Sequence, residues 1–145
     1  MLKELLLRNP KDKIIAICLG LIIVSSVLLI VFLTGLNEIV GIIILDNYFF
    51  GVKIKLFFLY YIVDIIILLA IIYTLQRKII FGIYLGIFWS MFNLLENIYD
   101  IPIFISDPHL IFEELVFIFL YAYLLLLFIV NYKHSLVSNF KQELS

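Results

Sequence analysis

The chain has 145 residues, of which 66% are hydrophobic and only 14% are charged. A soluble domain holds about 45–50% apolar and about 25% charged residues, so this composition excludes an ordinary water-soluble fold. The net charge of −1 and the ten dispersed Lys and Arg residues also exclude a nucleic-acid-binding surface. We therefore predict a single integral membrane domain over residues 1–145, with the lipid bilayer as its surroundings.

The first apolar segment, residues 14–36, is long enough to cross a bilayer as a helix, which takes about 20 residues. Asn9 suits a helix cap and Pro10 suits a first helical turn. The apolar core of a cleaved signal peptide holds roughly 7–15 residues, so we expect this longer segment to be retained. Residues 37–55 follow, and they are interpreted as interfacial, as re-entrant or as an extension of the first helix.

Three further apolar segments also have the length of a membrane-spanning helix. The third is expected to end at Pro102, because proline cannot continue a helix, and Asp107 with Pro108 suits the start of the fourth. The connections between the second and third segments and between the third and fourth segments are short, and short connections join antiparallel neighbours. The fold class predicted is therefore an all-α membrane protein, an antiparallel four-helix bundle with spans at residues 14–36, 56–75, 79–101 and 110–130.

Basic residues are distributed unevenly between the two sides of the predicted membrane. Eight lie on the side of the two termini and two lie on the other side, and cytoplasmic loops carry the excess of Lys and Arg. We therefore predict a multi-pass protein of the cell membrane with both termini in the cytoplasm. The eight are Lys3, Arg8, Lys11, Lys13, Arg77, Lys78, Lys133 and Lys141, and the two are Lys53 and Lys55.

Acidic residues gather on the predicted outer side, where seven acids and two lysines give a net charge of −5. Acids contribute little to the orientation in which a membrane protein inserts, so insertion does not require this asymmetry. The acidic residues are interpreted either as part of a functional site or as a solvated loop surface. One group near the outer ends of the third and fourth spans is interpreted either as a cation site or as helix-end acids that favour the helix dipole. Its members are Glu96, Asp100, Asp107, His109, Glu113 and Glu114.

The third span carries a stripe of polar and small residues along one face. At about 100° per residue its eight members fall within an arc of about 120°, and this face is expected to turn toward protein or water. Three small residues at its inner end predict a helix-packing seam, within the bundle or in a dimer. The stripe consists of Gly82, Gly86, Trp89, Ser90, Asn93, Glu96, Asn97 and Asp100.

Asp64 lies near the middle of the second span. A lone carboxylate at that depth is costly unless it is neutral, hydrogen-bonded or paired with a cation, and no Lys or Arg lies within the four spans. We expect Asn93 to be its best hydrogen-bond partner, with Tyr60 as a second donor one turn away. The alternative interpretation is a neutral, hydrogen-bonded packing residue.

The sequence favours three functions in descending order. The first is binding or permeation of a cation, a proton or an amphipathic ligand through an outward-facing cavity. The second is an accessory subunit of a membrane complex, with a homo-oligomer or another membrane protein as partner. The third, an enzyme acting on lipid, is less expected, because no motif for a known catalytic site, resident metal or cofactor is present. The cavity is assigned to Asp64, Asn93, Glu96, Asn97, Asp100, Glu113 and Glu114.

Overall fold

A computed structural model describes residues 10–34, 48–49, 52–53, 58–105 and 108–143 of the chain. The expected capping roles of Asn9 and Asp107 lie outside these residues. Within them are four helices: α2 (Pro10–Leu33), α4 (Phe58–Gln76), α5 (Phe81–Phe104) and α6 (Pro108–Glu143). The prediction of four helices is confirmed, and Pro10 and Pro108 open their helices as expected, because a proline in the first turn loses no hydrogen bond.

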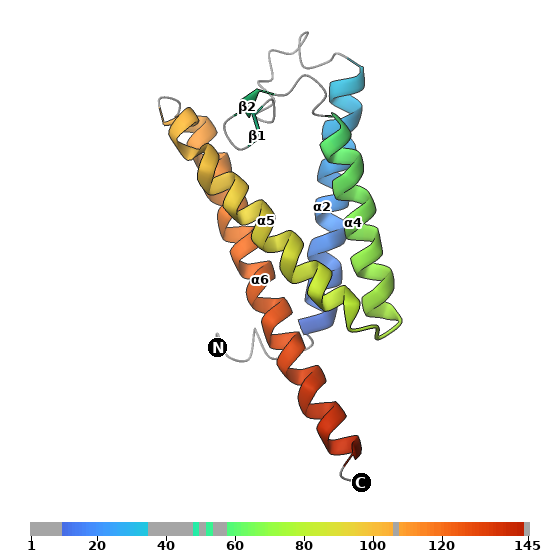
Figure 1. The fold of residues 1–145 in the computed structure, drawn as a ribbon. Coiled ribbons are helices and arrows are strands. Elements are labelled where there is room, and N and C mark those ends of the chain that lie inside the picture. Colours follow the sequence, from blue (N-terminus) through green and yellow to red (C-terminus); the bar gives the residue numbers. More distant parts are fainter. Residues whose placement is uncertain (1–9, 35–47, 50–51, 54–57, 106–107, 144–145) are drawn as a thin grey trace.

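Successive helices run in opposite directions (Figure 1). The start of α2, the α4–α5 turn and the end of α6 lie toward one end of the bundle, which we call the basic end. The opposite end, which holds β1, β2 and Ile105, is called the hairpin end. Three of the four helices are long and apolar enough to cross a membrane, over Pro10–Val31, Leu59–Gln76 and Ile111–Leu136.

Two predicted helix ends were wrong. The helix α5 continues through Pro102 to Phe104. Pro102 lies in the last turn, so the helix loses one hydrogen bond there and ends two residues later. The helix α6 continues to Glu143 rather than ending at Val130, since its polar extension contains neither proline nor glycine. At about 1.5 Å per residue its 36 residues reach about 54 Å, beyond a hydrocarbon core of about 30 Å.

A short hairpin follows α2, and the sequence did not predict it. Strand β1 (Tyr48–Phe49) pairs antiparallel with β2 (Val52–Lys53), with Tyr48 opposite Lys53. The helix α2 ends at Leu33, three residues before the predicted end of the first span. The described residues test none of the three interpretations of residues 37–55, because residues 35–47, 50–51 and 54–57 lie outside the described ranges.

The turn between α4 and α5 is as tight as its sequence predicted. The amide of Ile79 donates to the carbonyl of Thr74 over 2.9 Å, and the amide of Lys78 donates to the carbonyl of Leu75 over 3.1 Å. Lys78 adopts a φ of 57°, the left-handed conformation that this type of helix end requires after its last helical residues. The turn therefore reverses the chain within a few residues and sets α5 beside α4.

The four helices form a ring in which α2 and α5 each pack against α4 and α6. The most extensive contacts are those of α5 with α6 and of α2 with α4. Large apolar side chains also cover the outside of the ring, as expected where lipid replaces water. Toward the basic end the interior is filled by five side chains that we call the apolar plug: Leu68, Ile71, Leu124, Leu127 and Phe128.

Candidate functional site

The buried polar side chains lie in the middle of the bundle and toward its hairpin end, on the other side of the apolar plug. They come from all four helices, so each helix contributes apolar residues to one half of the interior and polar residues to the other. Such a division places the costly groups where they can reach one another and water. The set comprises Ser25, Asp64, Ser90, Asn93, Glu96, Asn97, Asp100 and Glu114.

Asp64 on α4 joins three helices through its two carboxylate oxygens. Its side chain is only 2% exposed. The hydroxyl of Ser25 on α2 lies 2.5 Å from Oδ2, and the indole Nε1 of Trp89 on α5 donates to Oδ1 over 2.8 Å. Both distances are typical of charge-assisted hydrogen bonds. Two neutral donors from neighbouring helices therefore hold a buried acid, and neither is a cation.

The expectation that Asn93 bonds to Asp64 was wrong. Asn93 is fully buried, but its Nδ2 donates to the backbone carbonyl of Trp89 over 2.8 Å. Its Oδ1 accepts a hydrogen bond from the hydroxyl of Tyr60, which the sequence had assigned to Asp64. The asparagine side chain bonds one turn back along α5, whereas the longer indole of Trp89 reaches across to α4.

Ser25 was not predicted to belong to the site, and Trp89 was predicted to lie on the stripe without a role of its own. The position of each residue in the sequence could have identified it as part of the site. Ser25 and Ser26 are the polar residues in the middle of the first apolar run, and Trp89 shares the arc of the polar stripe. A donor at these depths is a natural partner for a mid-membrane acid.

The polar stripe of α5 continues toward the hairpin end as a ladder of asparagine side chains. Asn97 donates through Nδ2 to the backbone carbonyl of Asn93 over 2.6 Å. The same nitrogen lies 3.3 Å from Oε2 of Glu96. Because each amide bonds to the turn before it, the stripe is rigid and its free faces turn toward the interior of the ring.

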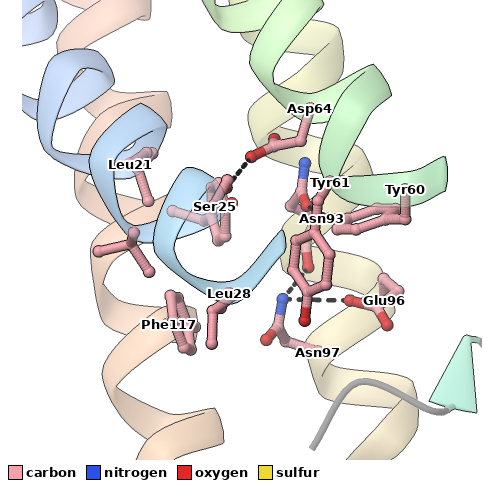
Figure 2. A pocket seen from close by; sticks show the side chains of 12 residues that line it. Leu21, Ser25, Leu28, Tyr60, Tyr61, Asp64, Asn93, Glu96, Asn97 and Phe117 are labelled. Atoms are coloured by element: carbon pink, nitrogen blue, oxygen red, sulfur yellow. Dashed lines mark hydrogen bonds between the residues drawn. The ribbon is translucent and has the colours of Figure 1, made fainter. Parts of the chain in front are cut away.

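A half-enclosed cavity lies between the four helices next to Asp64 (Figure 2), and the empty space in it and in the open solvent at its mouth is together about 470 Å³. Its enclosed part has room for water-sized molecules rather than for a drug-sized ligand. In Figure 2, Ser25 from α2 faces Asp64 from α4, and the α5 ladder closes the side. The cavity is lined by Leu21, Val24, Ser25, Leu28, Tyr60, Tyr61, Asp64, Asn93, Glu96, Asn97, Phe117 and Tyr121.

Four of the seven predicted site residues line this cavity: Asp64, Asn93, Glu96 and Asn97. The other three lie apart from it, since Asp100 and Glu114 are buried elsewhere and Glu113 is exposed. Among the side chains that the structure describes, no three of the types His, Cys, Asp and Glu gather in a way that holds a metal ion. Asp107 and the side chain of His109, two members of the predicted cation cluster, lie outside the described residues, so that cluster stays a prediction.

The small residues of α5 face other helices of the same chain. A Cβ at Gly82 would overlap the side chain of Thr74 on α4, and one at Gly86 would overlap the ring of Phe128 on α6. Ser90, the third member, is buried. The missing side chains therefore let α5 approach both of its neighbours.

Comparisons with known proteins do not place the chain in a family: no family model, no curated protein and no solved structure matches it. The described residues form four helices, of which three are long and apolar enough to cross a membrane.

Proposed function

We propose that the chain is a cell-membrane protein with four membrane-spanning helices and cytoplasmic termini, which binds a small cation or a proton at Asp64 from the outer side. The observation that carries this proposal is the buried acid itself. Asp64 is held by two neutral donors at the edge of a half-enclosed polar cavity. No Lys or Arg lies within the spans predicted from the sequence, residues 14–36, 56–75, 79–101 and 110–130, to neutralise it. An acid in such a place is costly unless it takes up a positive charge.

The outward face of α5 supports a fourth membrane span. Its average apolarity is lowered by the polar stripe, which is buried inside the ring. Its exposed side chains are those that lipid accepts, among them Phe81, Phe88, Met91 and Leu95. With 24 residues the helix reaches about 36 Å, enough for a bilayer core of about 30 Å.

The orientation rests on the basic residues. The basic end of the bundle carries Arg77 and Lys78 in its turn and Lys11 and Lys13 near the start of α2. Membrane proteins keep such an excess in the cytoplasm. The hairpin end, with the cavity, then faces the outside.

Binding is favoured over permeation because the interior has only one polar half. Toward the basic end the apolar plug fills the ring, and each of its side chains is at most 1% exposed. An ion crossing this layer would lose its hydration without finding polar partners. The cavity is also too small for the amphipathic ligand or the lipid substrate that the sequence left open.

The alternative function, an accessory subunit of a membrane complex, was suggested by the small and polar residues of α5 as a surface for a partner. The small residues of α5 were expected to accept a neighbouring helix, and Thr74 and Phe128 of the same chain occupy that place. The polar stripe likewise faces the chain's own cavity. We therefore favour the binding role.

Replacing Asp64 by asparagine tests this function. Asparagine keeps the size of the side chain but cannot take up a positive charge. Acid titration in unbuffered detergent solution counts the protons taken up, and calorimetry with sodium, potassium, calcium and magnesium chlorides detects bound cations. We expect the wild type to bind one proton or cation per chain that Asp64→Asn does not bind.

The matched control is Glu113→Gln, which removes an exposed acid outside the cavity. It should bind cations as the wild type does. Identical proton uptake and identical calorimetry for the wild type and Asp64→Asn would contradict the proposed function.

A further inference from the structure

We propose that the ligand of this cavity is the proton, and that it binds to Oδ2 of Asp64, the oxygen that faces Ser25. This inference rests on the proposed function and narrows it from small cations to one. The two carboxylate oxygens of Asp64 have different partners, and this difference determines which of them can change state.

The Trp89 side of the carboxylate accepts a hydrogen bond in every state. An indole nitrogen donates and cannot accept, so Oδ1 must remain an acceptor for Nε1 at 2.8 Å. The Ser25 side is different, because a hydroxyl both donates and accepts. When Asp64 is ionised, Ser25 donates to Oδ2. When Oδ2 carries a proton, the new O–H group donates to Oγ of Ser25 across the same 2.5 Å.

Proton binding is a balanced step at these atoms. A hydronium ion in the cavity transfers its proton to a lone pair of Oδ2, an O–H bond forms, and a water molecule is left behind. The carboxylate loses its negative charge, and no oxidation or reduction occurs. The hydroxyl of Ser25 then rotates from donor to acceptor, so both states keep two hydrogen bonds at Asp64.

A metal ion fits this site poorly. Calcium takes six to eight oxygen ligands and magnesium close to six. Here both carboxylate oxygens already face donor groups, and Asn93 uses its Nδ2 on Trp89 and its Oδ1 on Tyr60. Within the described ranges no third acid or histidine joins Asp64 to complete a metal shell. A proton needs only one oxygen and leaves these hydrogen bonds in place.

Other titratable groups surround Asp64 and must be separated from it in any measurement. Among the described residues that line the cavity, Glu96 on α5 is the one carboxyl group besides Asp64. The thiol and the phenols lose their protons in a more alkaline range than a carboxyl group does. These groups are Cys18 from α2, Tyr60 and Tyr61 from α4, Glu96 from α5 and Tyr121 from α6.

Trp89 gives this proton site its own optical reporter. It is the only tryptophan in the chain, and its indole N–H contacts Oδ1 of Asp64. Protonation removes a negative charge next to the indole ring. The fluorescence emission of Trp89 should therefore respond to the protonation of Asp64 more strongly than to the protonation of any other group.

The test uses the full chain in nanodiscs of phosphatidylcholine. Emission is recorded from about pH 4 to about pH 9, and then at fixed pH with sodium, potassium and calcium chlorides. We expect one transition, of one proton, that the three salts do not reproduce. It should be absent in Asp64→Asn, should keep its size of one proton but with a displaced midpoint in Glu96→Gln, because Glu96 lines the same cavity, and should be unchanged in Glu113→Gln. In Ser25→Ala it should move to higher pH by about one unit, tenfold in proton affinity, because the ionised acid loses a charge-assisted hydrogen bond and the neutral acid loses only a weaker neutral one.

The outcomes distinguish the inference from the proposed function. If a salt at fixed pH changes the emission of the wild type but not of Asp64→Asn, the site binds that cation and the proton assignment is overturned. If neither acid nor salt changes the emission of the wild type, both proposals fail. Should Asp64→Asn not fold, Asp64→Glu takes its place, and it is expected to keep the transition with a displaced midpoint. A transition unmoved by Asp64→Glu would overturn the assignment.

Discussion

Replacing Gly86 by leucine is expected to separate α5 from α6 and to lower the stability of the bundle more than any other single change considered for this chain. Any Cβ at this position would overlap the ring of Phe128, with Cε2 only 2.6 Å away. Phe128 is fully buried in the apolar plug and has no open space to move into. Overpacking costs about 1–3 kcal/mol in ordinary cores, and this overlap with a fully buried aromatic ring should cost about 3 kcal/mol.

Thermal unfolding in detergent, followed by size-exclusion chromatography, measures this effect. The matched control is Gly20→Leu, because no heavy atom lies within 4 Å of a Cβ built at Gly20, which is exposed on α2. This variant should unfold at the wild-type temperature. Adding Phe128→Ala to Gly86→Leu should restore part of the lost stability. A Gly86→Leu protein as stable as the wild type would contradict the packing of α5 on α6.

Replacing Trp89 by phenylalanine is expected to make Asp64 bind its proton more tightly. The change removes the N–H donor at Oδ1 while an aromatic ring remains to stack on Phe92 and Tyr60. That hydrogen bond favours the ionised acid, and a bond to a charged group is worth about 1.5–3 kcal/mol. The protonated acid also loses a bond, a neutral one worth about 0.5–1.5 kcal/mol, so the difference of about 1–1.5 kcal/mol should raise the midpoint of proton uptake by about one pH unit.

Acid titration measures this midpoint, because the variant lacks the tryptophan whose fluorescence would report it. The control is Phe88→Leu, which changes the exposed neighbour of Trp89 on the outer face of α5. It should leave the midpoint where it is in the wild type. A midpoint that stays unchanged or falls in Trp89→Phe would show that the indole does not stabilise the ionised form of Asp64.

The helices were predictable because hydrophobicity alone determines where they form. Each predicted span overlaps one observed helix, since a long apolar run has few other ways to satisfy its backbone. The end of α6 was not predictable in the same way. A membrane sets the end of an apolar run, but Asn131 and the residues that follow have no reason to leave the helix. The hairpin of β1 and β2 was not predictable either, because the length of apolar segments carries no information about so short a pair of strands.

The candidate site was predictable in its location but not in its hydrogen bonds. Helical periodicity identified the buried face of α5, and depth identified Asp64. Which side chains meet depends on reach and on the rotation of each helix about its axis. Asn93 and Trp89 share one face of α5, yet the longer side chain contacts Asp64 and the shorter one bonds to its own helix. Spacing along one helix does not determine such a choice.

The measurement that tests the account most directly asks from which side the proton reaches Asp64. The protein is reconstituted into vesicles whose inner and outer pH are set independently, and Trp89 emission is followed after a step in the outer pH alone. A second sample carries Cys18→Ser and Thr34→Cys, which places one thiol at the exposed hairpin end of α2. An impermeant maleimide then counts the molecules whose hairpin end faces outward.

If the cavity opens only toward the hairpin end, the fraction of the emission that responds to outer pH will equal the fraction that the maleimide labels. The remaining molecules should respond only when the inner pH is changed. A response of every molecule to outer pH, or of the unlabelled fraction instead of the labelled one, would contradict a proton site that is closed on the basic side by the apolar plug.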